Sequence, residues 1–548
     1  MARCKVYLCA WHNASRVVLE IGDREMLHNA GMTRRSFIGA TSTAAAFLGL
    51  GLVGCGGEKK SSEEVKANTD ATIAIANAYK TKNFHPSNTS SALACGTNWH
   101  VVEGLYGFDY SDYSVHKELA AEDEPTKVDD TTFEISLRKD AKFSDGTAVT
   151  ADDVVKSFER CTAEGNIYIP MLSPIASIEK KDDTTVTVKT AYPFSLLKQR
   201  LTIIRIVPAS MDDDTLTNKP IGSGPWAYDK VDGEVQVTAK PNEYYNGDLK
   251  AGAGMMQWDV QVDATARKTA FNEGTDMIME SVPAEDVDSL KSAGAKIDTV
   301  QGFGLVFMML NATKAPFDNV KVRQACRYAL DVDKMIANTF SGQAAAVTSY
   351  LPENHANYHK SATVYTHDVD KAKALLSEAG YTPGKITLST TDADFVVSMS
   401  AQVQQDLEAI GFTVEIQKNQ SAAMYSAIDQ DPKSYDVVLA PGDPSCFGND
   451  PDLLMNWFYG DNTWTQKRTE WAGDPKCKEL QELMAQAVTK EGSEQQDIWN
   501  QCFDLIAEYA PLYPVVHKQV NTAYYEDKIA DFKGIGTTGV YAVGAKAK

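Results

Sequence analysis

Residues 133–160 read FEISLRKDAKFSDGTAVTADDVVKSFER and place a strand, a turn and a helix in that order. The first six residues of this stretch alternate apolar and polar side chains, which predicts a half-buried strand. Thr150, followed three positions later by Asp153, is typical of a capping box and predicts that a helix begins there. Strands and helices alternate along the rest of the chain, so the fold class we expect is α/β.

The second half of the chain contains a clear strand–helix–strand order. We predict a strand at 385–390, a helix at 397–410 and a second strand at 412–416. This order favours a parallel unit of the sheet. Residues 435–439 form another short apolar run, which predicts a buried strand that leads into Asp443.

Length and composition exclude several classes of protein. At roughly 150 residues per domain, 548 residues predict three or four folded units. Apolar residues make up 43% and charged residues 23%, which argues against wholesale disorder and against a protein with many membrane spans. The net charge of −21 disfavours nucleic acid as a partner. Nine cysteines are too few for a small disulfide scaffold.

The N-terminal region has the layout of an export signal. Arg34 and Arg35 precede an uncharged run at 39–54, and this run ends in small residues before Cys55. The pattern resembles a twin-arginine signal followed by a lipobox, in which Cys55 would carry acyl chains that hold the protein at a membrane. An uncleaved anchor helix is the alternative. Translation from Met32 is the simplest explanation of the residues that precede the signal.

Several segments resemble family 5 of the extracellular solute-binding proteins, which contains the dipeptide- and oligopeptide-binding components of ABC importers. Residues 133–160 and 311–330 are the most specific of them, and the resemblance covers nearly all of residues 70–548. The other matching segments are VEGLY at 102–106, IGSGPW at 221–226, NEYY at 242–245, the helix at 370–381 and APLYPVV at 510–516.

The resemblance implies a two-lobe periplasmic-binding-protein-like fold (type II, cluster C) with an extra domain on lobe I. Crossing strands would join the lobes, and a hinge movement would close them on a ligand. The boundaries that it implies are 1–54 for the N-terminal extension and export or lipoprotein signal, 55–69 for a flexible tether, 70–105, 223–303 and 518–548 for lobe I, 106–222 for the extra domain, and 304–517 for lobe II.

Asp443 is the candidate for binding a ligand's α-amine. It follows the predicted strand at 435–439, and ligands of open α/β lobes gather at such strand ends. In peptide-binding members of the family, an Asp in a comparable segment holds the ligand amine. This chain lacks the Trp that often precedes that Asp, and Asp450 is an alternative match. The competing interpretation is that Asp443 merely caps a turn before Pro444.

Aromatic side chains are common in the walls of ligand sites. Each candidate wall residue is of a type more often found in a core, and Phe303 is favoured because Gly302 and Gly304 flank it at the predicted hinge. The candidate walls are Trp99, Tyr106, Phe303, Phe447 and Trp457.

Other chemistry receives little support from the sequence. His355, His359 and His367 suggest a metal clip, but they occupy a polar stretch without a helical stripe, and we expect loop residues and no metal site. No G-x-S-x-G, H-E-x-x-H or P-loop motif occurs, which disfavours a secreted hydrolase. We expect no cofactor.

The function predicted from these patterns is that of a monomeric, extracytoplasmic lipoprotein that captures a short peptide or another small polar solute. Its partners would be ABC permease subunits and, through the lipid anchor, the membrane. A binder of a metal complex, haem or another non-peptide solute, and a lipoprotein that reports ligand to a sensor, are the alternatives.

Overall fold

A computed structural model describes residues 65–548. The predictions made for the N-terminal signal, for Cys55, for the start at Met32 and for most of the tether lie outside the described residues. Within 65–548, none of the helices combines the length and the apolar character that a membrane crossing requires.

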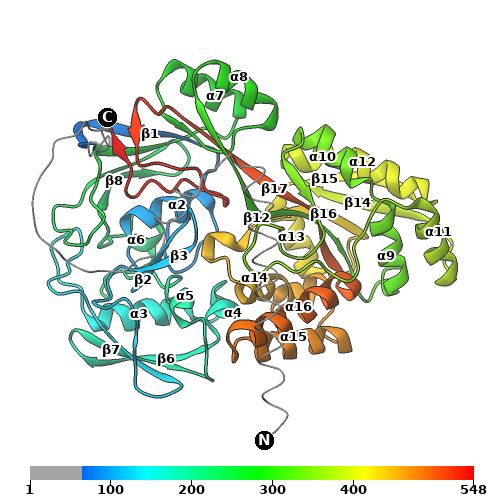
Figure 1. Cartoon of the computed structure of the whole chain (residues 1–548), viewed down its shortest axis with the longest axis horizontal. Coiled ribbons are helices and arrows are strands. Elements are labelled where there is room, and N and C mark those ends of the chain that lie inside the picture. The colour runs from blue at the N-terminus through cyan, green and yellow to red at the C-terminus, as the bar shows by residue number, and fades with distance from the viewer. Residues whose placement is uncertain (1–64) are drawn as a thin grey trace, which may run out of the picture. The chain divides into compact units, whose positions relative to one another are not determined.

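One long mixed sheet runs through the described chain (Figure 1). One end of the sheet belongs to the second lobe and contains parallel strands. The other end belongs to the first lobe and contains both parallel and antiparallel strands. In spatial order the strands are β15 (Thr413–Asn419), β14 (Lys385–Thr391), β16 (Val437–Gly442), β12 (Lys296–Leu310), β17 (Leu512–Tyr524), β11 (Ile278–Met279), β1 (Asn68–Asn77), β10 (Ala253–Val260), β9 (Gln236–Pro241) and β8 (Trp226–Asp232), with β13 (Ala344–Ala346) paired to β17.

The two longest strands, β12 and β17, connect the lobes. They pair antiparallel from Lys296 opposite Tyr524 to Gln301 opposite Gln519, and the register then shifts before Leu305 pairs with His517. The break spans residues 302–304, where the sequence predicts a hinge. Gly302 is required there because a Cβ at this position would lie 1.6 Å from the carbonyl oxygen of Gly536.

The second lobe is built as its sequence pattern predicts. Strands β14 and β15 pair in parallel, and α12 (Asp394–Ala409) connects them, so the strand–helix–strand unit is confirmed. Apolar side chains of β14, β16 and α12 form one buried cluster. The remaining helices of this lobe are α9 (Val320–Ala329), α10 (Val332–Phe340), α11 (Val369–Glu378), α13 (Ser421–Gln430), α14 (Pro451–Tyr459), α15 (Pro475–Ala487), α16 (Gly492–Tyr509) and the π-helical turn η3 (Trp464–Arg468).

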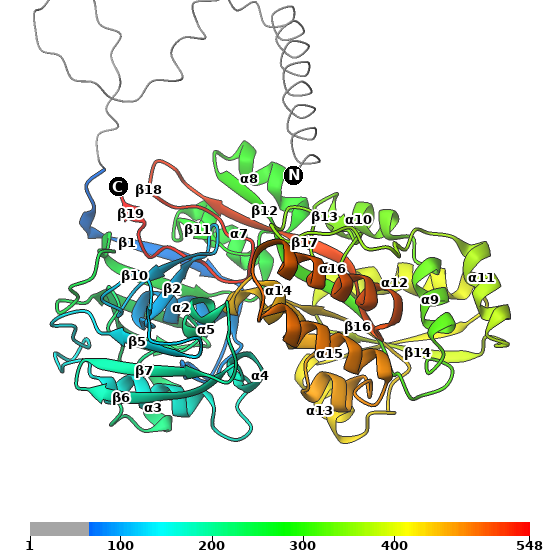
Figure 2. The ribbon, with the colours of Figure 1, turned by 60° about the horizontal axis from the view of Figure 1, so that its bottom comes forward.

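The first lobe carries a separate small sheet (Figure 2). The strand predicted within 133–160 is β5 (Thr132–Ser136), and the predicted helix is α3 (Ala151–Cys161). The capping box is confirmed, because the Thr150 amide donates to the Asp153 carboxylate at 2.8 Å. The other strands of this sheet are β4 (Thr126–Lys127), β7 (Thr185–Thr190) and β6 (Ile175–Asp182), while β2 (Tyr106–Asp109) and β3 (Ser114–Lys117) pair as a separate hairpin.

Short helices and a C-terminal segment complete the first lobe. The residues after β17 begin with β18 (Ile529–Ala530), which pairs with β19 (Lys546–Ala547) near the C-terminus, and β19 lies against β1. The Glu280 carboxylate fixes this segment because it accepts the amides of Ala78 and Gly539 at 2.9 and 2.8 Å. The helices are α2 (Ala92–Val101), α4 (Ile169–Leu172), α5 (Leu197–Leu201), α6 (Asp213–Asn218), α7 (Ala264–Glu273), η1 (Ala284–Asp286) and α8 (Val287–Ser292).

Candidate functional site

Asp443 lies where the central strand of the second lobe meets the C-terminal segment of the first. β16 ends at Gly442, and Asp443 caps the following 3₁₀ turn η2 (Pro444–Phe447). Its Oδ1 atom accepts the amide of Ser445 at 3.1 Å and the hydroxyl at 2.5 Å. Its Oδ2 atom accepts the hydroxyl of Thr537 at 3.0 Å. One oxygen therefore caps the turn, and the other faces the opposite lobe.

The carboxylate of Asp443 is poorly compensated. Burial raises its pKa, whereas the hydrogen bonds from Ser445 and Thr537 and the charge of Lys518 act in the opposite direction. Within residues 65–548, Asp443 forms no ion pair with a lysine, arginine or histidine. A partly buried carboxylate that lacks a cationic partner favours binding of a ligand's ammonium group.

Lys518 supplies a positive charge to the same region. It lies on β17 next to the register break, and its ammonium group is 4.2 Å from the ring centroid of Phe395 in α12. Burial lowers its pKa, and the charge of Asp443 opposes this effect. Among the residues that the structure describes, the ammonium has no hydrogen-bonding or ion-pair partner. We call Asp443, Thr537, Lys518 and Phe395 the interlobe site.

Asp450, the alternative amine partner, is already neutralised. Its two oxygens accept from the guanidinium of Arg200 at 2.7 and 2.8 Å, and Arg200 is fully buried. Burial acts to raise the pKa of Asp450, but Arg200 lowers it below its ordinary value. Asp450 also caps α14 by accepting the amide of Leu453. These contacts give it a structural role, and they favour Asp443 of the two acids.

Two of the predicted aromatic walls line one small cavity of about 30 Å³ between the lobes. Trp99 reaches it from α2 and stacks on Tyr110 with ring centroids 4.0 Å apart. Phe447 reaches it from the second lobe and packs edge-on against Tyr168. Trp457 lies behind Phe447 and stacks on it at 5.8 Å.

The other two predicted aromatics lie in the core. Tyr106 is fully buried on β2, with the ammonium group of Lys198 over its ring at 5.5 Å. Phe303 is 1% exposed at the register break and packs against Tyr350 and His517. Both side chains support the walls of the lobes and do not line the 30 Å³ cavity.

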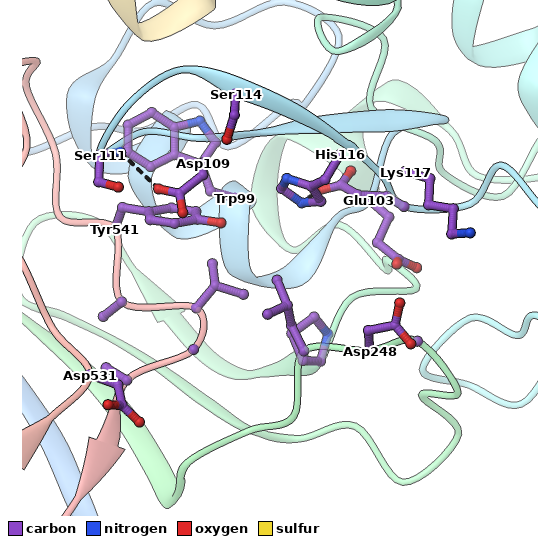
Figure 3. A pocket seen from close by; sticks show the side chains of 18 of the residues that line it. Trp99, Glu103, Asp109, Ser111, Ser114, His116, Lys117, Asp248, Asp531 and Tyr541 are labelled. Carbon is purple, nitrogen blue, oxygen red and sulfur yellow. Dashed lines mark hydrogen bonds and ion pairs between the residues drawn. The ribbon is translucent and has the colours of Figure 1, made fainter. Parts of the chain in front are cut away.

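A larger cavity of about 950 Å³ opens beside Trp99 (Figure 3). The β2–β3 hairpin contributes Asp109 and His116, and the C-terminal segment contributes Asp531 and Tyr541. Its lining contains no residue of β14, β15 or β16, so closure of the second lobe does not enclose it.

The three histidines that were weighed as a metal clip, His355, His359 and His367, have separate partners. His355 Nε2 lies 2.6 Å from the carbonyl oxygen of Asn449, and His367 Nδ1 lies 2.8 Å from that of Ala329. His359 faces Asp504 at 3.3 Å. In the described range 65–548, no three metal-binding side chains gather in one place.

Lys518 and Thr537 were missed by the sequence analysis. Both lie far along the chain from Asp443, so local patterns do not connect them. The one available signal was a charged residue inside the otherwise apolar first half of β17, where Lys518 follows VVH.

Two lobes joined by a pair of strands, with charged groups at their junction, define the class of two-lobed solute receptors. The chain belongs to the bacterial extracellular solute-binding proteins, family 5, whose sequence profile matches residues 114–466.

Individual relatives agree with this assignment. The glutathione-binding protein GsiB of Pectobacterium atrosepticum is 28% identical over 369 residues, which cover 64% of this chain and 70% of the relative. GsiB of Escherichia coli K12 is 24% identical over 473 residues, which cover 84% and 91%. The crystal structure of a dipeptide-binding protein from Pseudoalteromonas sp. SM9913 with Met-Leu superimposes with a TM-score of 0.75 at 19% identity, covering 87% and 100%. This last likeness supports the two-lobe α/β fold.

Proposed function

We propose that this protein captures a short peptide, or a similarly small zwitterionic solute, between its lobes and presents it to the permease of an ABC importer. Membership of the solute-binding family supports capture without covalent chemistry. The names of two curated relatives, a glutathione-binding protein and a probable D,D-dipeptide-binding protein, support a peptide as cargo.

The observation that carries the proposal is the pair of opposite charges in the interlobe site, neither of which forms an ion pair among the described residues. Asp443 would bind the ligand's ammonium group, and Thr537 would position the carboxylate of Asp443 from the other lobe. Lys518, which has no polar partner among the described residues, would bind the ligand's carboxylate. Each charge of a zwitterionic ligand would form the ion pair that Asp443 or Lys518 lacks. A zwitterion would therefore bind more tightly here than a singly charged or neutral solute.

We also propose the localisation and the lobe boundaries that the sequence predicts. Cys55 would carry the lipid anchor, and residues 55–69 would be the tether of a monomeric, extracytoplasmic protein. Lobe I would comprise 70–105, 223–303 and 518–548, with lobe II at 304–517 and the extra domain at 106–222. The register break at 302–304 supports a hinge at that boundary.

Mass spectrometry of protein purified under native conditions tests the function directly. We expect a small peptide to be carried through purification, and a library of unblocked di- and tripeptides to raise the unfolding temperature without being cleaved. Recovery of a metal complex with no response to peptides would favour the non-peptide alternative, and turnover of the peptides would overturn the proposal.

The role of Lys518 is tested by the Lys518→Met variant, which keeps the length of the side chain and its contact with Phe395. We expect it to weaken binding of a free dipeptide far more than binding of its C-terminal amide, measured by calorimetry. Equal weakening of both ligands would remove Lys518 from the carboxylate role.

A further inference from the structure

Two cysteines from opposite lobes line one small cavity beside the interlobe site. Cys95 lies in the first turn of α2, and Cys446 lies in η2, which Asp443 caps. Both are free thiols. The other free thiols of the described residues belong to the interior of single lobes or of the small-sheet region.

Close packing fixes both thiols in this position. The sulfur of Cys95 lies 3.9 Å from the carbonyl oxygen of Thr89, and this oxygen accepts the Tyr168 hydroxyl at 2.7 Å. On the other side, the Tyr110 hydroxyl donates to the carbonyl oxygen of Cys446 at 3.0 Å. The contacts that position the pair therefore join the first lobe to the second.

The packing also controls access to the thiols. Cys95 is 7% exposed and Cys446 is 6% exposed, and the cavity that both line has a volume of about 30 Å³. Such a cavity holds one or two water molecules at most. A reagent larger than water therefore needs the lobes to separate before it reaches the thiols, whereas the arrangement described here brings both cysteines to one cavity.

We propose that Cys95 and Cys446 are a site of reversible disulfide formation that fastens the closed lobes together, with a small organic disulfide as the oxidant.

The chemistry is two successive thiol–disulfide exchanges. In the open protein one cysteine loses its proton, its thiolate attacks the oxidant, and one thiol of the oxidant leaves. On closure the second cysteine loses its proton and attacks the protein-bound sulfur, so that the Cys95–Cys446 bond forms and the second thiol leaves. Two electrons and two protons pass to the oxidant, which is reduced to two thiols. A dithiol reverses both steps.

The consequence is a block on exchange of cargo. Strands β12 and β17 connect the lobes, and the proposed hinge lies at the shift in their register. A disulfide on the cleft side would block movement about that hinge. The oxidised protein would neither release a bound solute nor admit a new one until a reductant restored the thiols.

Peptide mapping of the full chain tests the proposal without knowledge of the ligand. The reduced protein is incubated with 2-hydroxyethyl disulfide, quenched with acid and digested without reductant. We expect a cross-linked peptide pair that contains Cys95 and Cys446, with the loss of two hydrogen atoms in mass, and its disappearance after dithiothreitol. Separate mixed disulfides on the two cysteines, with no cross-link, would overturn the proposal.

Cys161→Ser is the matched control variant. Cys161 is a buried free thiol like the proposed pair, but it lies on α3 of the first lobe. We expect this variant to form the cross-link as the wild type does. If wild-type mapping instead finds Cys95 linked to Cys161, the thiols do not connect the lobes and the proposal fails. Cys446→Ser should lose the cross-link and also exchange ligand equally fast before and after oxidant.

Discussion

Asp443 and Asp450 lie in one loop, but only one of the two carboxylates has a positively charged partner. Asp450 has Arg200 on both oxygens, whereas Asp443 faces Thr537 and has no ion pair within residues 65–548. The sequence predicts the residue type and its place after a buried strand. It does not predict which acid is neutralised, because Arg200 reaches this loop from a distant helix.

Asp443→Asn should weaken binding of free-amine peptides by roughly 30-fold or more, because the ligand's ammonium group then lies in a partly dehydrated place without its counter-charge. An N-acetylated peptide lacks that charge and should lose much less. Calorimetric titration of both ligands measures the difference. Asp450→Asn keeps the helix cap, and we expect this control to lower the unfolding temperature without changing the preference for a free amine.

Acid should reproduce the effect of Asp443→Asn in the wild-type protein. The pKa of Asp443 lies above its ordinary value, so its carboxylate gains a proton at a higher pH than an exposed aspartate. Affinity for free-amine peptides should therefore fall as the pH drops through that raised pKa. The same titration with the Asp443→Asn variant should be flat over this range, and a parallel decline in both proteins would count against Asp443.

At the scale of elements, the crossing strands show why part of the hinge was predictable. Gly302-Phe303-Gly304 before an apolar run predicts a flexible point, and β12 does lose its register there. The sequence did not predict that Phe303 would turn into the core against Tyr350, because the side on which a strand presents its residues changes at an irregular register.

Gly302→Ala should lower the free energy of unfolding by roughly 3 kcal/mol, since its Cβ would lie 1.6 Å from a backbone oxygen that cannot rotate away. Gly304→Ala is the matched control, because the nearest atom to its Cβ would be a side-chain oxygen of Asp443 at 3.4 Å. Urea unfolding of both variants compares them, and similar losses would contradict a specific backbone contact at position 302.

The junction of β10 with the turn after α7 contains a buried acid pair. Burial and the neighbouring Asp259 raise the pKa of Asp276 to about 7. The folded protein therefore holds a proton that the unfolded chain releases near its ordinary value, so stability falls as pH rises from about 4 to 7. Asp276→Asn should raise the free energy of unfolding at pH 8 by roughly 2 kcal/mol. At pH 4 the variant and wild type should differ little.

For the whole molecule, the family segments predicted the two-lobe α/β fold, and the parallel unit of the second lobe followed from local periodicity. The closeness of Lys518 and Thr537 to Asp443 did not follow, because tertiary contacts between distant segments leave no local pattern. The same limit applies to Trp99 and Phe447. The sequence predicted that both aromatic residues line a ligand site, but their position at one cavity depends on how the lobes pack.

Small-angle X-ray scattering should detect the movement that this fold permits. We expect the radius of gyration of the solute-free protein to fall when a tight-binding peptide is added, because the lobes pivot about β12 and β17 and close. The Asp443→Asn protein with the same peptide provides the control and should keep its larger radius. An unchanged profile with saturating peptide would contradict a closing receptor.

Trp99 stacks on Tyr110 within the first lobe and its small-sheet region, and it borders the cavity that Phe447 completes from the second lobe. Withdrawal of Phe447 would bring water to the indole while the stack remains intact. The chain contains eight tryptophans, so the difference between the emission spectra of the wild type and the Trp99→Phe variant reports the environment of this indole. A shift of that difference to longer wavelength would then report opening in dilute solution without a dye.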